Sequence, residues 1–381
     1  MLSAAVPGLA TRPALVASVG SAFPRRSYTQ DEIGTLLGLT NRVVRKLLSA
    51  PHIRTRRLFL PAEEPGPGGR IPVETPVDLH RRFRDGALEI GAQAIGQALS
   101  AASLEAGDVD YLMCITTTGF MVPGLSSLLS RELGFRRDLH RADLVGMGCN
   151  AGLNGMNAVA QWAGNHPDKI ALLVCCEINS AIYVADDTPG TGIVNSIFGD
   201  GAAAAVVTAG SAAGAGRGVR PQILDFESFC IPEQWPAMRF DWNAEHHKWS
   251  FFLDRDIPYV IGFNVYQPVD RLLARHGLER SAIRHWVMHT GGGAVIDSIK
   301  VSLGLDEHDV RHTRSVLRDY GNISSGSFLV SLERLLAEGT AVAGDLGVMI
   351  TMGPGAQIET ALLRFVGDEA GHEVNAGGDH R

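Results

Sequence analysis

The sequence predicts an α/β protein built from two similar halves. Short runs of apolar and β-branched residues alternate with Ala- and Leu-rich amphipathic stretches, which is typical of α/β folds. The chain also resembles itself: Tyr111–Phe135 matches His285–Leu305 as a strand, a Thr- or Gly-rich turn and an amphipathic helix that ends near a Leu-Gly pair. We expect a duplicated unit rather than a solenoid, which would need more and shorter repeats.

The expected elements follow from local composition. The predicted strands are Leu15–Val19, Tyr111–Thr116, Ile170–Cys176, Ala202–Thr208, His285–Thr290 and Gly347–Met352. The predicted helices are Leu79–Ala101, Ala151–Gly164, Val265–His276 and Ser327–Gly339. These elements place one half in residues 15–215 and the other in residues 216–366. Residues 1–14 form an N-terminal extension, and the Gly- and charge-rich tail at 367–381 is expected to be disordered.

The repeat extends beyond the first matched segment and predicts where the two halves meet. A Gly/Asn turn opens a helix in each half, GMGCNAGLNGMNAVAQWAG in one and DYGNISSGSFLVSLERLLAEG in the other, and a buried strand follows. Cys149 lies 32 residues after Thr117, and Asn322 lies 33 after His289. All α/β chains look somewhat self-similar, but the matched order and spacing favour a duplication. If a pseudo-twofold axis relates the halves, one cavity collects both turns and both strand ends.

Composition excludes several functional classes. Among 381 residues, 34 Lys and Arg face 41 Asp and Glu, and the net charge of −7 argues against a general nucleic-acid binder. An anionic substrate must then be met by a local basic patch. No window reaches eighteen uncharged apolar residues, and the start lacks a signal-peptide pattern. We expect a soluble, cytoplasmic protein that does not bind membranes.

Cysteine usage fits this location. The five cysteines are Cys114, Cys149, Cys175, Cys176 and Cys230. No C-x-x-C pair or His-rich cluster indicates a metal site, and an odd number of cysteines fits a reducing compartment. The Gly199–Ala205 run lacks G-x-G-x-x-G spacing and precedes a strand, so it predicts a close-packed turn rather than a nucleotide loop.

Cys149 is the candidate nucleophile. It lies in GMGCNAG, where glycines permit a sharp turn and a helix is expected from Ala151. A helix N-terminus lowers the pKa of a nearby thiol, and the thiolate is the reactive form. The alternative is a buried cysteine that acts only as a small apolar residue.

His289 and Asn322 are the candidate partners of this cysteine. His289 ends the run HWVMH before three glycines, where an imidazolium could pair with a thiolate in a cleft. Asn322 follows Gly321 and could donate to a developing oxyanion. A core histidine and a helix N-cap are the simpler interpretations, but the predicted convergence favours a shared site.

Five ordered motifs resemble a known family. The combination of GCNAG, FGDGAAA, a His 140 residues after the Cys, YGNISSGS and GPG resembles the type III polyketide synthases of the chalcone synthase superfamily, from about Leu15 to Phe365. The resemblance implies a five-layered αβαβα thiolase-like fold, a homodimer, CoA thioesters as substrates, and no metal or redox cofactor.

Longer runs resemble a bacterial subgroup of this family. They include TTTGFMVPGLSSLL, DLVGMGCNAGLNGMNAV and MRFDWNAEHHKWSFFLDRDIPYV. The resemblance implies an acyltransferase of antibiotic biosynthesis that uses malonyl-CoA as starter and extender and cyclises the chain to 3,5-dihydroxyphenylacetyl-CoA. It also suggests dehydratase- and hydratase-family enzymes of the same pathway as partners.

Other functions stay open at this point. One is a type III synthase with another acyl-CoA starter that makes a pyrone, alkylresorcinol or naphthalene product. Another is a carrier-protein-dependent ketosynthase, for which a GACAA-like elbow would be expected instead of GMGCNAG. A catalytically silent thiolase-fold scaffold is the alternative outside enzymes, although no triad residue is lost.

The resemblance also implies roles for individual residues. Cys149 would carry the acyl group, and His289 and Asn322 would hold the thioester oxygen. Phe198 in FGDG and Phe251 in SFFLD resemble gatekeepers between a CoA tunnel and the cavity. The residues expected to line the cavity are Thr117, Thr118, Asn179, Trp242 and Ser324.

Three further positions complete the expected site. Glu177 would order the site without reacting, and Val122 lies in a loop that reaches the partner's cavity in plant relatives, where Met is usual. Candidates for binding the CoA phosphates are the basic residues Arg45, Lys46 and Arg56. A basic run of this kind is also typical of a solvated helix face.

Overall fold

The computed structural model describes residues 12–61, 72–209 and 218–367. The strands of the first half are β1 (Ala14–Ala22), β4 (Tyr111–Thr116), β5 (His140–Val145), β6 (Ala171–Glu177) and β7 (Gly201–Ala209). Those of the second half are β8 (Arg220–Cys230), β11 (His285–Met288), β12 (Leu346–Gly353) and β13 (Gln357–Val366). They form one nine-stranded sheet in the order β11-β12-β13-β8-β1-β7-β6-β4-β5.

The pairing pattern confirms two pseudo-equivalent halves. The seam is the antiparallel pair β1–β8. Moving outward in the first half, β1 is antiparallel to β7, β7 is antiparallel to β6, and β6 is parallel to β4. Moving outward in the second, β8 is antiparallel to β13, β13 is antiparallel to β12, and β12 is parallel to β11. The same order and directions on both sides are the signature of a duplicated unit.

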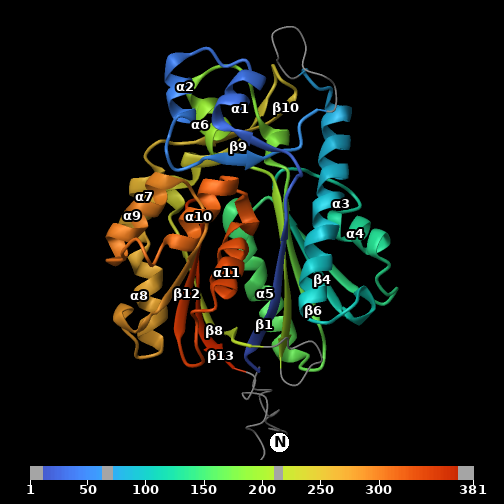
Figure 1. Ribbon diagram of the computed structural model, residues 1–381, viewed down its shortest axis with the longest axis vertical. Helices are drawn as coiled ribbons and strands as arrows, with labels where there is room; N and C mark the ends of the chain where they lie inside the picture. Colours follow the sequence, from blue (N-terminus) through green and yellow to red (C-terminus); the bar gives the residue numbers. More distant parts are fainter. Residues whose placement is uncertain (1–11, 62–71, 210–217, 368–381) are drawn as a thin grey trace, which may run out of the picture.

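Helices cover and separate the two half-sheets, which gives the predicted five layers (Figure 1). α3 (Pro76–Ala101) and α4 (Leu125–Leu133) cover the first half. α7 (Ile257–Asn264), α8 (Tyr266–Arg275) and α9 (Gly293–Leu303) cover the second. α5 (Ala151–Asn165) contacts strands of both halves, as does α11 (Ser327–Glu338), so these two helices form the central layer.

Strand β6 shows why the layers form. Every residue in it is buried, and successive side chains point to opposite faces of the sheet. Leu172, Val174 and Cys176 belong to the core under α3. Leu173 and Cys175 belong to the central core with α5 and α11. A strand buried on both faces reads as a continuous apolar run, which is how the sequence presents it.

Smaller elements form a cap at the end where the two central turns lie (Figure 1). They are β2 (Ser27–Thr29), α1 (Gln30–Leu36), α2 (Arg42–Leu48), β3 (Thr55–Arg57), α6 (Pro189–Ile197), β9 (Met238–Asn243) and β10 (Lys248–Leu253). α10 (Arg311–Tyr320) leads from the second half into the Asn322 turn.

The predicted strands and helices are all present, with ends shifted by at most a few residues. One shifted end concerns a candidate site residue. Strand β11 ends at Met288, so His289 lies in the turn that follows and not in the strand. Strands β5, β8 and β13 and the β9–β10 hairpin were not predicted. The boundary at 215 and 216, most of the N-terminal extension, and the tail from 368 lie outside the described residues. In the described part, no helix has the length and apolarity needed to cross a membrane.

Candidate active site

The Cys149 turn opens the central helix of the first half. Gly148–Asn150 form a 3-10 turn directly before α5, as the glycines predicted. Gly148 has φ +78, and a Cβ there would lie 2.3 Å from Pro354, so only glycine fits both the conformation and the space. The turn holds Cys149 buried, with 7% of its surface exposed.

The structure brings the three predicted residues together from both halves. Asn322 Nδ2 lies 3.5 Å from His289 Nε2. Cys149 Sγ lies 3.5 Å from Ser324 Oγ, two residues after Asn322. Asn322 Oδ1 accepts from Ser324 N at 2.7 Å, which leaves the Asn322 Nδ2 hydrogens for the site. The predicted convergence of the two turns is therefore present.

Burial of the thiol and the imidazole disfavours the thiolate–imidazolium pair that the sequence suggested. Burial raises the pKa of Cys149 to about 12, although hydrogen bonds from Ser324 and Asn322 lower it. Burial also lowers the pKa of His289 to about 3. In this dry site, desolvation of the charged forms outweighs the helix N-terminus.

Ser327 favours one tautomer of His289 in the observed arrangement. Its Oγ lies 2.7 Å from His289 Nδ1 and donates to the Ser324 carbonyl at 2.7 Å. A hydroxyl has one hydrogen, so in this arrangement Ser327 accepts from Nδ1–H. His289 Nε2 then presents a lone pair toward the site. Sequence reasoning missed Ser327, because nothing in SSGS distinguishes it from its neighbours.

Glu177 fixes the first strand end beside the nucleophile. It is fully buried and accepts from Thr117 N at 2.9 Å, Thr118 Oγ1 at 2.9 Å and Ser325 Oγ at 2.6 Å. Thr117 Oγ1 in turn accepts from Gly148 N at 3.0 Å. Burial raises the pKa of Glu177. The carboxyl thus ties the Thr117 segment, the Cys149 turn and the second half together.

A small chamber of about 10 Å³ adjoins Cys149 and shares part of its wall with a larger cavity. Of the predicted lining residues, the chamber contains Thr117, Thr118, Asn179, Phe198, Phe251 and Ser324. The larger cavity has a volume of about 750 Å³ and shares Thr117, Thr118, Ile182, Phe240 and Pro354 with the chamber. The Phe198 and Phe251 rings meet edge to face, with centroids 5.6 Å apart, and form part of the chamber wall. Cys149 therefore lies beside a cavity of the size usual for small-molecule sites.

Comparisons with known proteins agree with this geometry. Residues 9–211 match the family model for the N-terminal domain of chalcone and stilbene synthases, and residues 234–367 match the model for their C-terminal domain. The chain belongs to the chalcone and stilbene synthase family. Membership confirms the predicted resemblance and the enzyme class, an acyltransferase of the type III polyketide synthase kind.

Similar relatives and solved structures support the family and the fold. A 3,5-dihydroxyphenylacetyl-CoA synthase from Streptomyces toyocaensis is 49% identical, over 93% of this chain and 90% of the relative. One from Amycolatopsis balhimycina is 47% identical, over 92% of each. The crystal structure of 1,3,6,8-tetrahydroxynaphthalene synthase from Streptomyces coelicolor A3(2), a bacterial type III polyketide synthase, has a TM-score of 0.81 at 28% identity. It covers 93% of this chain and 99% of the other.

Trp242 is not where the sequence placed it in this synthase. Its side chain is 54% exposed and lies edge to face with Trp249, its partner across the β9–β10 hairpin. Trp249, not Trp242, lines the larger cavity. The two tryptophans are paired across the hairpin, and the sequence alone does not reveal which of them faces the cavity.

Arg56 does not bind phosphate, because it is fully buried. Its guanidinium donates to Tyr183 Oη at 2.8 Å, to the Asn195 carbonyl at 2.6 Å and to the Phe198 carbonyl at 2.8 Å. It therefore supports the segment that carries Phe198. Of the other two candidates on α2, Arg45 is half-buried and Lys46 is exposed.

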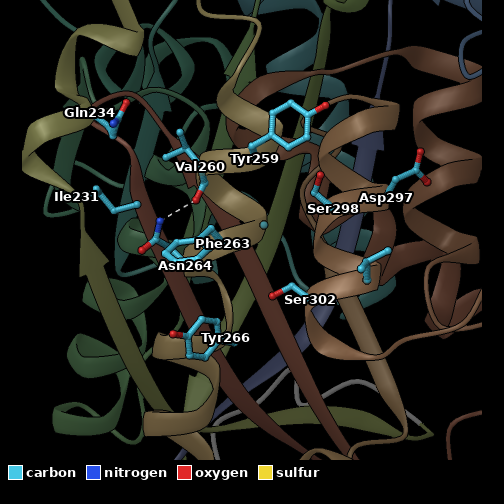
Figure 2. Close-up of a pocket in the computed structure, with 12 residues that line it drawn as sticks. Ile231, Gln234, Tyr259, Val260, Phe263, Asn264, Tyr266, Asp297, Ser298 and Ser302 are labelled. Carbon is cyan, nitrogen blue, oxygen red and sulfur yellow. Dashed lines mark hydrogen bonds between the residues drawn. The ribbon is translucent and has the colours of Figure 1, made fainter.

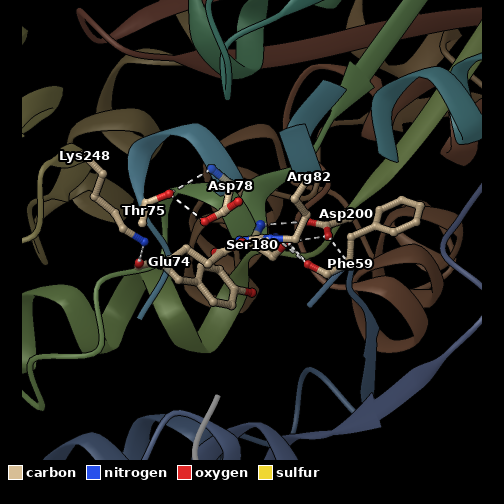
Figure 3. A network of polar contacts seen from close by, with 9 residues as sticks. Phe59, Glu74, Thr75, Asp78, Arg82, Ser180, Asp200 and Lys248 are labelled. Carbon is tan, nitrogen blue, oxygen red and sulfur yellow. Dashed lines mark hydrogen bonds and ion pairs between the residues drawn. The ribbon is translucent and has the colours of Figure 1, made fainter. Parts of the chain in front are cut away.

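The predicted close-packed turn after Phe198 is held by a polar network (Figure 3). Asp200 is fully buried and accepts from Ser180 N at 2.7 Å, Ser180 Oγ at 2.7 Å and Phe59 N at 2.6 Å. Arg82 donates to Ser180 Oγ at 2.9 Å and pairs with Glu74. Burial raises the pKa of Asp200 to about 6. The network fixes Ser180, and with it the position of the adjacent Asn179.

A second hollow, of about 850 Å³, lies between α7 and α9 on the outer face of the second half (Figure 2). Tyr259, Phe263 and Val301 line it and are largely exposed. It contains none of the predicted site residues. Among the described residues, one group has the spacing of metal ligands: Asp306 and His308, which are exposed, and Asp309, which is half-buried. None of these lines either cavity at Cys149.

Proposed function

We propose that this chain condenses malonyl-CoA units, with malonyl-CoA as both starter and extender, and cyclises the tetraketide to 3,5-dihydroxyphenylacetyl-CoA. The observation that carries the proposal is that Cys149 Sγ, buried beside the small chamber, lies 3.5 Å from Ser324 Oγ of the other half. Asn322, two residues before Ser324, places its Nδ2 3.5 Å from His289 Nε2. The product assignment is supported by 49% identity to a synthase named for that product.

Loading begins with proton transfer from the neutral thiol. His289 Nε2 takes the Cys149 proton while the sulfur bonds to the malonyl carbonyl carbon. The bond between that carbon and the CoA sulfur then breaks, and the imidazolium returns its proton to the departing CoA. Ser327 holds the ring through Nδ1 during both transfers, because a freely rotating imidazole would lose the alignment.

Condensation places a second malonyl thioester oxygen near Asn322 Nδ2 and His289. Loss of CO2 leaves an enolate, whose charge these donors stabilise in a water-poor site. His289 donates here when its proton is on Nε2, and Ser327 supports this tautomer by turning its hydroxyl hydrogen from the Ser324 carbonyl to Nδ1. The enolate carbon attacks the acyl carbon on Cys149, and the Cys149 sulfur leaves. Return of the chain to Cys149 allows the next round.

The larger cavity is suited to a short polyketide. Its volume of about 750 Å³ falls within the usual range of small-molecule sites, roughly 300–1,000 Å³. Phe198 and Phe251 are proposed to separate it from the CoA entrance. Of the basic candidates, we retain Lys46, with Arg45 as its neighbour, for the CoA phosphates, because Arg56 is committed to the interior.

A homodimer would close the open side of the site. Strand β5 is the last strand of the sheet, and Phe120, Val122 and Val145 near it are 71%, 83% and 43% exposed. Phe120 and Val145 also line the larger cavity. Exposed strand edges and apolar patches are usually covered, so we propose that a second copy covers them and that Val122 contributes to the partner's cavity.

The proposed setting is a cytoplasmic pathway of antibiotic biosynthesis. All five cysteines are free thiols, as expected in a reducing compartment. Dehydratase- and hydratase-family enzymes of the same pathway are proposed to act after this synthase. The predicted absence of a metal or redox cofactor is retained as part of the proposal.

The test is incubation of the purified protein with malonyl-CoA alone, followed by mass spectrometry of the products, with Cys149→Ala as the control. We expect a 3,5-dihydroxyphenylacetyl product that disappears in the variant. Turnover only after addition of another acyl-CoA starter would overturn the substrate assignment and leave the condensing chemistry intact. A naphthalene product would overturn the proposed tetraketide length of the polyketide chain. The absence of any product with every thioester tested would favour a catalytically inactive scaffold protein.

A further inference from the structure

Asn150, the residue after the nucleophile, has a buried side chain with no partner. Its surface is 1% exposed, and its Oδ1 is enclosed without a hydrogen bond. Its Nδ2 donates to no residue in the described ranges. A buried amide without partners is costly and rare, so this one requires an explanation.

The common structural role of an asparagine at this place is absent. Asn150 is the residue before α5, where asparagine usually accepts a hydrogen bond from the first turn of the helix. Here the side chain makes no such capping bond. It turns instead over Gly353 of β12, where a Cβ would come within 2.2 Å of Oδ1. The absence of a side chain at Gly353 lets Oδ1 pack against that backbone, while the residue as a whole lines the larger cavity.

The other polar side chains of that wall are already engaged. Thr117 Oγ1 accepts from Gly148 N, Thr118 Oγ1 donates to Glu177, and Gln357 Nε2 donates to Glu359 at 3.0 Å. Arg239, which is also in the wall, pairs with Asp241. Among the described neutral polar side chains that line the cavity, Asn150 is thus the one whose donor and acceptor are both unused.

We propose that the Asn150 amide binds oxygens of the polyketide on Cys149 and sets the fold from which the chain cyclises. The inference rests on the proposed function. A poly-β-ketone carries an oxygen on every second carbon. Because Asn150 Oδ1 is enclosed against Gly353, the amide acts through Nδ2, whose two hydrogens can be donated to keto oxygens of the chain. Because Asn150 follows Cys149 directly, a chain that grows from the sulfur into the larger cavity passes it.

If Asn150 guides cyclisation, its removal should change the ratio of cyclised product to other products more than it changes the rate of CoA release. Asn150→Leu keeps the approximate size of the side chain and removes both hydrogen-bonding groups. We expect CoA release from malonyl-CoA to fall about two- to fivefold. The share of the native cyclised product among all products should fall at least about tenfold, in favour of lactones that form without guidance.

The matched control is Asn157→Leu on the same helix. Asn157 accepts from Gln161 on the helix surface and lines neither cavity, so both CoA release and product ratio should stay at wild-type values. Folding of each variant is checked by circular dichroism and thermal melting. Asn150→Ala, which adds no bulk, replaces the leucine variant if that one fails to fold.

Three results would overturn the proposed role of Asn150. A wild-type product ratio in a folded Asn150 variant would overturn the role of this residue alone. Equal loss of Cys149 acylation and of all products would also overturn it, because Asn150 would then support the nucleophile turn. Silence of the wild-type protein with every thioester would overturn the proposed function and the Asn150 role with it.

Discussion

The two turns that open α5 and α11 occupy equivalent places in the duplicated halves, yet they carry opposite kinds of side chains. The first presents Cys149 and Asn150, a thiol held only by weak contacts and an amide without partners. The second presents Ser324, Ser325 and Ser327, whose hydroxyls contact Cys149, Glu177 and His289. The duplication supplies a symmetric frame, and the side chains make one turn reactive and the other supportive.

The largest effect is expected from a substitution in the second turn, at Asn322. Asn322→Ala removes the Nδ2 donor from the thioester oxygen, so malonyl-CoA decarboxylation should fall about 10²- to 10³-fold. Release of CO2 from carboxyl-labelled malonyl-CoA measures the step. A loss below about threefold would mean that Asn322 only shapes the turn.

The second prediction tests whether the Cys149 thiol of the first turn is protonated at neutral pH. Because burial raises the pKa of Cys149 to about 12, the thiolate fraction should rise about tenfold per pH unit through the neutral range. Alkylation of Cys149 by iodoacetamide should follow that rise, with Cys149→Ala as the blank. An ion pair would instead give a rate that levels off below neutral pH, and such a plateau would contradict the description.

The third prediction concerns Ser327. Ser327→Ala leaves His289 Nδ1 without a partner, so kcat should fall about tenfold while KM for malonyl-CoA changes little. Ser327→Thr keeps the hydroxyl and should restore most of the rate. A matched change, Ser331→Ala, removes a buried hydroxyl in the same helix that bonds only to backbone carbonyls. An equal loss of kcat in Ser331→Ala would indicate a general packing effect instead.

The smallest kinetic effect is expected at Lys46, which the sequence grouped with Arg56 as a basic residue. Arg56→Met should lower the free energy of unfolding by about 3 kcal/mol, because it leaves several buried acceptors unpaired. Lys46→Ala should leave stability unchanged and raise KM for malonyl-CoA about three- to fivefold. Denaturant titration and initial rates measure the two quantities. The reverse pattern would restore Arg56 as a phosphate ligand.

The sequence predicted what depends on period and spacing. Buried strands such as β6 appear as continuous apolar runs, and the spacings from Thr117 to Cys149 and from His289 to Asn322 correctly predicted that these residues would meet. It could not predict contacts that depend on three-dimensional register. Arg56 and Lys46 look alike in a basic run, but only one points inward. Trp242 and Trp249 differ only in their place along a hairpin, and Ser327 is one serine among several.

The most direct test of the asymmetry between the two turns is to find where the acyl group sits. Asn322→Ala is incubated with malonyl-CoA, because slow decarboxylation should allow the loaded acyl group to accumulate, and the digested protein is analysed by mass spectrometry. We expect an acyl mass on the peptide that contains Cys149 and none on the peptide that contains Ser324–Ser327. An acyl group on one of those serines, or on any residue other than Cys149, would contradict this expectation.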